Sequence, residues 1–402
     1  GGQFKNNRFG GGKWFVVLNG KKNSEYDLVQ KISFDPDNQL AFWGNKGGVD
    51  NSYEFFGGEW FLNYKEKESP NFEDGSLLGP VFSPQGRLAY GGKKNQKYFW
   101  FIDHIENEGF DEVGPLLFSP KDDSFTYIAK EDNKAWVVFN GKRQEEFEKI
   151  KELSFSHDGQ WLFYAGFKEN KWFFVLNHQK RFALPFIGKI LFMEGSSFFA
   201  LEGKDSSGAF IVINGKKGPS YDKIELLGFS KQGKNFFYKA QKGKEFFWVA
   251  NQKELFKGPD VGLFLVSPYD STFVFTGKIQ SSWGVFVNGI KKIEGEGFEK
   301  IFFSPFNEIA TIEKQGPQKR VWIDKQVGLT FDEIKYVVPN PNKKQWVYVV
   351  QEKEKWYFVS NHVVIEKDQG GYQEILGLEY SQEEKSFIGL VLKNKIITLV
   401  KF

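Results

Sequence analysis

The chain has 402 residues, of which 40% are hydrophobic and 18% aromatic, so it can bury a large core and does not have the composition of a disordered segment. Its 54 Lys and Arg and 51 Asp and Glu are interspersed and leave a net charge of +3, which gives no argument for nucleic acid or a membrane surface as partner. The longest apolar run, 387–392, is far shorter than the roughly 18 residues that a spanning helix needs, so no transmembrane segment is predicted.

Cysteine is absent, which excludes a disulfide framework, a thiolate metal site and a cysteine nucleophile. The only methionine is Met193, which indicates that the initiator, with or without a signal peptide, is missing from the start. Since there is no cysteine to protect from oxidation, an exported bacterial protein is expected, located in the periplasm or outside the cell.

One strand-and-turn segment recurs from the N-terminus to the C-terminus. It first appears as WFVVLNG at 14–20 and returns, for example, as WVVFNGK at 136–142 and WGVFVNG at 283–289. Asn-Gly is the dipeptide that most readily forms a type I′ hairpin turn. The Asn or Asp that ends each strand is here called the marker, and the predicted markers are Asn19, Asn63, Asp103, Asn140, Asn177, Asn214, Asn251, Asn288, Asp324 and Asn361. Their spacing is 44, then 40, then 36 or 37 residues, which indicates a 37-residue repeat present ten times.

A single repeat contains four predicted strands. In the repeat that begins at 153, strands are expected at 153–156, 160–166 and 172–177, and a fourth, edge strand passes through Phe182 and Leu184. The Asn-Gly turns require antiparallel hairpins, which disfavours a β-solenoid. The sequence therefore predicts an all-β fold, a β-propeller of about ten four-stranded blades.

The order of strands along the chain suggests how the ends meet. A partial first blade at 1–30 holds a third and a fourth strand, nine full repeats follow over about 31–375, and a partial last blade at about 376–402 holds a first, second and third strand. Pairing of the N- and C-terminal strands would close 1–402 into a single propeller, with one third strand left over. Two smaller rings, or one ring of fewer blades with added strands, stay open as alternatives.

A second recurring motif precedes the second strand of many repeats. It reads FSPQG at 82–86, FSPKD at 118–122, FSHDG at 155–159, FSKQG at 229–233 and FSPFN at 303–307. Proline presets φ for the turn, and Asp, Asn or Gly tolerate the conformation that follows. The motif resembles the FSPDG repeat of WD40-like propellers, such as the periplasmic propeller of the Tol-Pal system and the propeller domain of the dipeptidyl-peptidase family. The resemblance implies the fold and not an activity, and the chain departs from it in its short period and its ten repeats.

An acidic motif follows most hairpins. It reads YDLV at 26–29, FDEV at 110–113, FEKI at 147–150, YDKI at 221–224, FEKI at 298–301 and FDEI at 331–334. The carboxylates could form a ring that binds cations or basic ligands. Because the motif returns in nearly every repeat, a structural role is favoured, in which each acid accepts backbone hydrogen bonds in an interblade loop.

Tryptophans and histidines receive structural interpretations for the same reason. The third-strand residues Trp14, Trp136, Trp172, Trp283 and Trp356 are predicted to share one repeat position with Phe210 and to pack between blades, which is favoured over sugar stacking. Three of the four histidines, His104, His178 and His362, directly follow a marker at a hairpin tip. One per blade, they are too far apart to share a metal, so no metal site is predicted.

The repeat is interrupted most clearly between the first two markers. The extra residues form a predicted loop at 44–59 between a second and a third strand, flanked by glycines. Its candidate residues for ligand or partner binding are Asp50, Asn51, Tyr53, Phe55 and Phe56. An insertion that only fills space is an equally open interpretation.

Motifs for catalysis are largely missing, since GxSxG, HExxH, phosphate-loop, EF-hand and Asp-box patterns are not met. No catalytic residue and no cofactor is therefore predicted. The expected function is a non-catalytic binding scaffold that presents loops on one propeller face to a protein or surface polymer, without nucleic acid. A structural subunit that self-assembles is the first alternative. A propeller-type glycosidase or lyase, with carboxylates over the central tunnel, is the second.

Overall fold

The computed structural model describes residues 3–5, 8–10, 12–50, 55–65, 67–73, 75–193, 198–230, 233, 235–365 and 370–402. All regular structure in these ranges is β-strand, which confirms the all-β prediction. A helix long and apolar enough to cross a membrane is not found in the part of the chain that is described.

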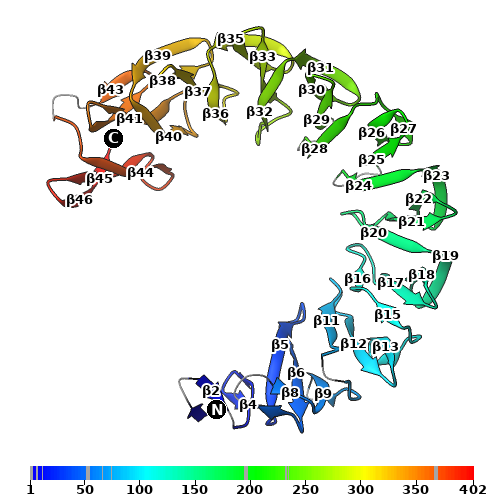
Figure 1. The fold of residues 1–402 in the computed structure, drawn as a ribbon. Coiled ribbons are helices and arrows are strands. Elements are labelled where there is room, and N and C mark those ends of the chain that lie inside the picture. The colour runs from blue at the N-terminus through cyan, green and yellow to red at the C-terminus, as the bar shows by residue number, and fades with distance from the viewer. Residues whose placement is uncertain are drawn as a thin grey trace. The chain divides into compact units, whose positions relative to one another are not determined.

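Apart from three two-stranded hairpins, the strands of the described residues group into ten successive antiparallel sheets, here called blades 1 to 10. In blades 1 to 9 the strands are hydrogen-bonded neighbours in chain order, and Figure 1 shows each set lying side by side. The first strand of blade 3 is split into β15 and β16, and blade 10 holds three strands. This four-stranded meander is the blade of a β-propeller, as predicted from the repeat.

The N-terminal half contains five blades and three short hairpins. Blade 1 consists of β5 (Leu28–Phe34), β6 (Leu40–Lys46), β9 (Glu59–Tyr64) and β10 (Lys67–Glu68); blade 2 of β11 (Leu78–Phe82), β12 (Leu88–Lys94), β13 (Lys97–Ile102) and β14 (Ile105–Glu106); blade 3 of β15 (Glu112–Val113), β16 (Leu117–Phe118), β17 (Phe125–Glu131), β18 (Lys134–Phe139) and β19 (Lys142–Phe147); blade 4 of β20 (Lys149–Phe155), β21 (Leu162–Lys168), β22 (Lys171–Leu176) and β23 (Gln179–Leu184); and blade 5 of β24 (Phe186–Phe192), β25 (Phe199–Asp205), β26 (Gly208–Ile213) and β27 (Lys216–Lys217). The hairpins pair β1 (Gln3–Lys5) with β2 (Arg8–Gly10), β3 (Val17–Leu18) with β4 (Lys21–Lys22), and β7 (Val49–Asp50) with β8 (Phe55–Phe56).

The C-terminal half contains the other five blades. Blade 6 consists of β28 (Lys223–Phe229), β29 (Phe236–Lys242), β30 (Glu245–Ala250) and β31 (Lys253–Gly258); blade 7 of β32 (Asp260–Val266), β33 (Phe273–Ile279), β34 (Ser282–Val287) and β35 (Ile290–Gly295); blade 8 of β36 (Phe298–Phe303), β37 (Ile309–Gln315), β38 (Gln318–Ile323) and β39 (Gln326–Phe331); blade 9 of β40 (Glu333–Pro339), β41 (Trp346–Glu352), β42 (Lys355–Ser360) and β43 (Val363–Ile365); and blade 10 of β44 (Glu374–Ser381), β45 (Ser386–Lys393) and β46 (Ile396–Lys401).

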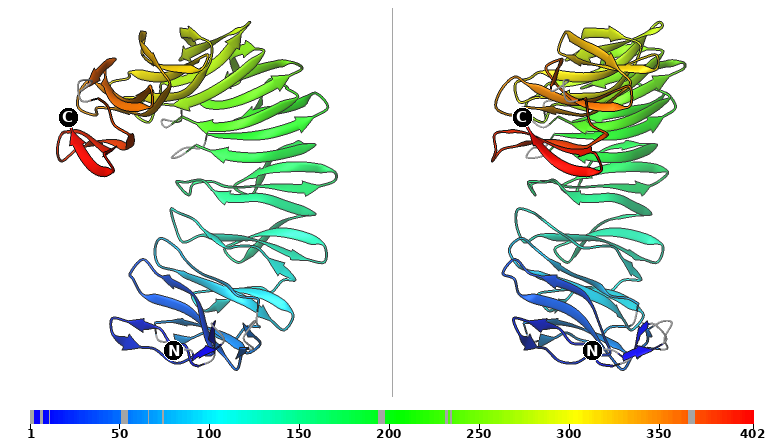
Figure 2. Two further views of the ribbon diagram at one scale, coloured as in Figure 1. Left: turned by 60° about the vertical axis from the view of Figure 1, so that its left-hand side comes forward. Right: turned by 90° about the vertical axis from the view of Figure 1, so that its left-hand side faces the viewer.

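The chain divides into two compact units, one formed by Gly1–Ser206 with Ile211–Lys217 and the other by Ser207–Phe210 with Gly218–Phe402. Within each unit the sheets follow one another in chain order, as Figure 2 shows for β5 to β23 in blue to green. The grouping of 1–402 into a single propeller, its partial end blades, and the closure of a ring by the terminal strands stay predictions.

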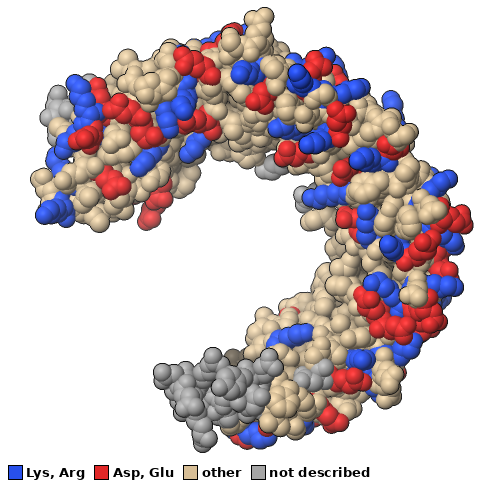
Figure 3. Space-filling view, in the orientation of Figure 1, with Lys and Arg blue, Asp and Glu red and all other residues tan. Residues whose placement is uncertain are grey.

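The core lies between consecutive blades. One cluster of buried residues joins Trp43, Trp60 and Phe72 of blade 1 and its following loop to Leu88 and Tyr90 of blade 2. The other clusters are built in the same way from adjacent blades. In Figure 3 charged side chains gather over β18 and β19, the third and fourth strands of blade 3. Within each unit, neighbouring blades therefore bury apolar faces against each other.

The markers recur for a reason that goes beyond the turn. Oδ1 of Asn177 accepts a hydrogen bond from the backbone N–H of Leu162 at 2.8 Å, and the Asn177 N–H donates to the Leu162 carbonyl at 2.8 Å. The marker thus closes the ladder between the second and third strands while adopting the positive φ of the turn. Eight markers make this side-chain bond: Asp103, Asn140, Asn177, Asn214, Asn251, Asn288, Asp324 and Asn361.

The marker predicted for blade 1 is wrong by two residues. Tyr64 pairs with Ala41 as Ile102 pairs with Ala89 in blade 2, so Lys65 stands at the marker position, with φ of 49°. Asn63 lies within β9 instead and accepts a hydrogen bond from the Tyr26 hydroxyl at 2.6 Å. The first two intervals between markers are therefore 46 and 38 residues. The sequence was misleading here because Asn63 is an asparagine, like most markers, whereas the residue at the marker position is Lys65.

A buried serine holds each FSP-type turn through hydrogen bonds to the backbone. The serine of the motif is buried in six blades, at Ser83, Ser119, Ser156, Ser230, Ser267 and Ser304. In blade 2 the Ser83 hydroxyl accepts the N–H of Arg87 at 3.0 Å, while the Ser83 N–H donates to the Arg87 carbonyl. Blade 1 uses Asp35 at this place, where its carboxylate accepts hydrogen bonds from the Tyr64 hydroxyl at 2.6 Å and the N–H groups of Gln39 and Asp37.

The hydrogen bond made by the marker side chain predicts that its removal lowers the stability of the chain. Asn177→Ala removes the acceptor of the Leu162 N–H, which should cost about 1 to 2 kcal/mol and lower the midpoint of thermal unfolding. Asn177→Asp keeps an acceptor of the kind that blades 2 and 8 use at Asp103 and Asp324, so it should cost only a few tenths of a kcal/mol. Equal midpoints for the two variants in circular dichroism melts would contradict this role.

Because of the buried Asp35 carboxylate, we expect the thermal stability of the chain to fall in acid. Burial raises the pKa of its carboxyl, but the hydrogen bonds from Tyr64, Gln39 and Asp37 outweigh burial and hold the pKa below its usual value. The stabilisation is therefore present above about pH 4, the pKa of an unfolded Asp, and is lost as the pH falls through the lower folded-state pKa. Asp35→Ser should reduce the loss of thermal stability between about pH 7 and about pH 3. The control Asp37→Ser should keep the wild-type pH dependence, and an unchanged profile in Asp35→Ser would contradict the assignment.

Candidate binding crevice between blades 7 and 8

The residues predicted from the 44–59 insertion are only partly described. Asn51 and Tyr53 lie outside the described residues, and Asp50 belongs to β7. Phe55 in β8 is half-buried and packs edge-on against Trp60 with ring centroids 6.2 Å apart, whereas Phe56 is 49% exposed. Their recognition role stays a prediction.

The ends of this insertion are strand, not loop, because β6 continues to Lys46 and β9 begins at Glu59. Sequence reasoning missed Asn45, a fully buried amide at the base of the insertion. Its Nδ2 donates to the Gly57 carbonyl and its Oδ1 accepts the Gly48 N–H, both at 3.0 Å. Asn45 therefore holds the two ends of the insertion together.

The acidic motif has the structural role that its repetition favoured. The carboxylates of Asp27, Asp111, Glu148, Asp222 and Asp332 each accept a backbone N–H from the hairpin between the second and third strands of the next blade. The FEKI motif at 298–301 departs from this pattern. There Glu296 accepts the Gly316 N–H at 2.9 Å, and Glu299 pairs with Lys319 at 2.9 Å.

The tryptophans do not share a single position. Trp172, Trp283 and Trp356 stand five residues before their markers, whereas Trp136 and Phe210 stand four before and so face the opposite side of the strand. Lysines of first strands cover two of the rings: Lys151 Nζ lies 4.1 Å from the Trp172 ring centroid, and Lys335 Nζ lies 4.3 Å from that of Trp356.

The histidines after the markers are part of the packing. The Tyr90 hydroxyl and His104 Nδ1 lie 3.0 Å apart, the Tyr348 hydroxyl and His362 Nδ1 lie 2.9 Å apart, and the His178 ring packs on Phe139. Each of these histidines follows a tyrosine by 14 residues, a signal that sequence reasoning missed. Within the described ranges, no group of three or more His, Asp or Glu side chains could hold a metal ion.

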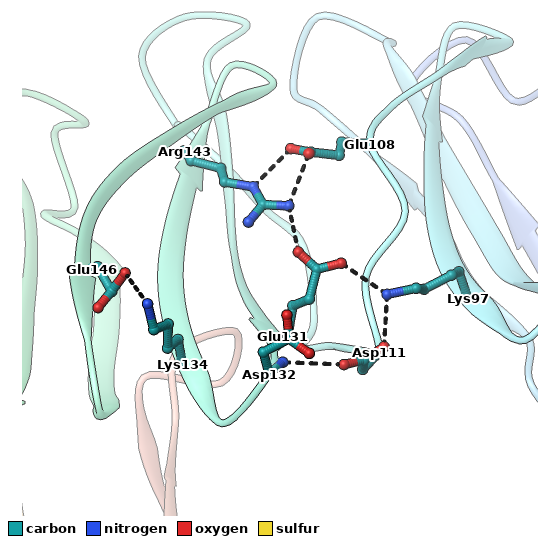
Figure 4. Close-up of polar contacts among 8 residues, drawn as sticks. All are labelled: Lys97, Glu108, Asp111, Glu131, Asp132, Lys134, Arg143 and Glu146. Carbon is teal, nitrogen blue, oxygen red and sulfur yellow. Dashed lines mark hydrogen bonds and ion pairs between the residues drawn. The ribbon is translucent and has the colours of Figure 1, made fainter.

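A network of ion pairs joins blades 2 and 3, as Figure 4 shows. Glu131 accepts from Arg143 and from Lys97, both at 2.8 Å, and Lys97 also reaches Asp111 at 2.7 Å. Arg143 pairs with Glu108 as well and lies 4.6 Å over the rings of both Phe110 and Trp136. The pKa of the Glu131 carboxyl is lowered by the hydrogen bonds from Lys97 and Arg143. Every charge is paired, so the network links two blades and leaves no group free for a ligand.

A crevice of about 500 Å³ lies in the second unit between blades 7 and 8. Its floor is apolar and its rim is polar. The floor consists of Val285, Val287, Ile293, Ile309 and Ile323; the rim consists of Lys292, Asn307, Glu308, Asp324, Lys325 and Gln326. A volume of this size is typical of ligand pockets. We call it the blade 7–8 crevice.

Aliphatic residues form the floor of the crevice at three repeat positions. At the junction of blades 6 and 7, these positions hold Trp248, Phe256 and Phe273, which pack in one aromatic cluster. Blades 7 and 8 have Val285, Ile293 and Ile309 instead, and these smaller side chains leave space that the three rings fill at that junction.

The residue type at these positions varies along the chain. At the junction of blades 8 and 9, the third position is Trp346, which is 1% exposed. The first and third positions are aliphatic between blades 1 and 2, with Leu62 and Leu88, and between blades 3 and 4, with Val137 and Leu162.

The same junction departs from the repeat at a buried carboxylate. In four blades a glycine of the second strand lies against a ring from the segment before that blade, so that a Cβ at Gly44, Gly92, Gly166 or Gly277 would overlap Tyr26, Phe72, Phe147 or Phe256, respectively. Blade 8 has Glu313 at this place, fully buried, facing Gly295 of blade 7. Its carboxylate accepts from Arg320 Nε and Trp322 Nε1, both at 2.6 Å, so the buried charge is compensated. The one short interval among the later markers, 36 residues, falls at this junction and was the available sequence signal.

A comparable crevice lies at the same repeat position in the first unit, between the β3–β4 hairpin and blade 1. Its lining is mostly polar and includes Lys21, Asn23, Ser24, Asn63 and Glu68. The blade 7–8 crevice is therefore the better candidate for an apolar group.

The chain matches no protein-family model, and no curated protein is similar to it in sequence. Among solved structures it is similar to the eukaryotic initiation factor, with 14% identity, a TM-score of 0.33, and 81% of this chain and 93% of that chain covered. It is similar to the Dos1 propeller with 12% identity, a TM-score of 0.27 and 92% of each chain covered. It is also similar to the β-propeller domain of the Trilobed protease from Pyrococcus furiosus, with 11% identity, a TM-score of 0.29, and 85% and 96% covered. These likenesses are low, and the fold assignment rests on the strand order described above.

Proposed function

We propose that this chain is a non-catalytic binding scaffold and that an apolar side chain of a protein partner docks in the blade 7–8 crevice. The observation that carries the proposal is the apolar floor of this crevice, where Val285, Ile293 and Ile309 stand at the positions that Trp248, Phe256 and Phe273 occupy between blades 6 and 7. A partner's ring inserted there would give this junction the aromatic packing of the junction between blades 6 and 7. A single buried anchor of this kind supplies a large part of the energy of many interfaces.

Filling the crevice from within tests this proposal. Ile309→Trp places in blade 8 the residue that blade 9 holds at the same position, Trp346, so the variant should fold and melt near the wild-type temperature. The probe is N-acetyl-phenylalanine amide, whose weak binding is measured by saturation-transfer NMR. We expect binding to the wild-type chain and a loss of about tenfold or more in Ile309→Trp.

The matched control is Ile290→Trp, which makes the same substitution on a 61% exposed side chain of β35 that does not line the crevice. It should bind the probe as the wild type does. Equal binding by all three proteins would place the probe elsewhere, and absence of binding by the wild type would refute a docking role for the crevice.

Other parts of the scaffold proposal rest on the sequence. The insertion at 44–59, with Asp50, Asn51, Tyr53, Phe55 and Phe56, is proposed as a second recognition element for a protein or a surface polymer. An exported bacterial location, in the periplasm or outside the cell, is proposed from the absence of cysteine.

A structural subunit that self-assembles is a second candidate, favoured by β46. This strand has no partner strand on its outer side among the described residues, and its side chains Ile396, Ile397 and Leu399 are 60 to 69% exposed. An apolar strand with a free edge readily pairs with a strand of another molecule.

Sedimentation velocity tests this candidate. The wild-type chain should assemble as its concentration rises, and the double variant Ile397→Lys with Leu399→Lys should stay monomeric because charges on an edge strand oppose pairing. A wild-type chain that stays monomeric over the whole concentration range would refute assembly through β46. Unchanged assembly by the double variant would assign it to another surface.

A further inference from the structure

We infer that the blade 7–8 crevice selects an extended peptide segment in which an aromatic or large aliphatic side chain stands next to an acidic residue. This inference rests on the proposed function, because it specifies the partner of the same site. It follows from the rim of the crevice, whereas the proposed function follows from the floor.

Two lysines at the rim are available to a ligand. Lys292 and Lys325 are exposed and have no ion-pair partner among the residues that the structure describes. Two other lysines of these blades are paired: Lys291 with Glu294 at 2.7 Å, and Lys319 with Glu299 and Glu333 at 2.9 and 2.8 Å. Two unpaired cations at the mouth of an apolar crevice can bind a carboxylate that stands beside an apolar side chain.

Two carboxylates also lie at the rim. Glu308 Oε2 accepts from Trp346 Nε1 at 3.2 Å, and Asp324 Oδ1 accepts the Ile309 N–H at 3.0 Å. Both carboxylates keep their charge, but these hydrogen bonds hold them in place on the strands. The lysine ammonium groups sit on flexible four-carbon stems and can extend over a bound ligand. We therefore expect the lysines, and not the carboxylates, to reach a ligand in the crevice.

The rim also carries two side-chain amides. The side chains of Asn307 and Gln326 are exposed at the rim and make no hydrogen bond within the described part of the chain. A primary amide offers both a donor and an acceptor, the pair of groups that the backbone of an extended peptide presents. Floor, lysines and amides together fit an apolar side chain, a carboxylate and a peptide backbone, so we favour a protein segment as the occupant.

Three blocked tripeptides with acetylated and amidated ends test the inference: Asp-Phe-Asp, Asn-Phe-Asn and Lys-Phe-Lys. At low ionic strength, titrations followed by NMR should show Asp-Phe-Asp binding roughly fivefold more tightly than Asn-Phe-Asn, since two exposed ion pairs contribute modestly. Lys-Phe-Lys should bind most weakly. Added salt should remove the advantage of Asp-Phe-Asp, because salt screens exposed charges.

Variants assign the effect to the rim. Lys292→Gln combined with Lys325→Gln should remove the advantage of Asp-Phe-Asp and leave Asn-Phe-Asn binding unchanged. The control Lys291→Gln, at a lysine that pairs with Glu294 and does not line the crevice, should behave as the wild type.

The outcomes separate the inference from the proposed function. If Asp-Phe-Asp and Asn-Phe-Asn bind equally and both are lost in Ile309→Trp, the acidic preference is refuted and the docking role stands. If Lys-Phe-Lys binds most tightly, the carboxylates and not the lysines govern the rim, and the inference is overturned. If none of the peptides binds, the docking role fails together with the inference.

Discussion

Apolar side chains of this chain are buried chiefly between neighbouring blades. A blade here has four strands with apolar residues on both faces, and such a sheet has no core of its own. Trp43 and Tyr90 are fully buried only because blades 1 and 2 pack against each other, and the same holds for Phe237 and Phe275 in blades 6 and 7. A repeat of this kind is stabilised by its neighbours, so each junction must be filled.

The polar features of the repeat serve this packing. The marker closes the end of each blade by pairing with the N–H of the second strand, and the acidic motif ties the hairpin of one blade to the loop of the blade before it. Both use a side-chain oxygen to satisfy a backbone N–H that the ladder leaves unpaired. Because these groups recur for structural reasons, a functional site is expected where the recurrence stops.

The junction of blades 7 and 8 is such a place. Here Val285, Ile293 and Ile309 stand where blades 6 and 7 have three rings. Glu313, which is bonded to Arg320 and Trp322, stands where four other blades have a glycine against a ring. The substitutions are mutually consistent, since a buried carboxylate facing Gly295 could not accommodate the aromatic contact of other junctions. The result is a crevice with an apolar floor, which supports a binding role more directly than the insertion at 44–59 that the sequence singled out.

The strand content, the repeat and the structural role of the acidic motif could all be predicted from the sequence, because alternation of apolar residues, Asn-Gly turns and fixed spacing are local properties of the chain. It misplaced the first marker, since Lys65 takes the turn conformation without the residue type of the other markers. It did not find the crevice. Val285, Ile293 and Ile309 are ordinary strand residues when read along the chain, and 24 residues separate the first from the last. Only tertiary packing brings them together and reveals that the three rings of the junction between blades 6 and 7 are missing here, because an empty volume depends on side chains from two sheets at once.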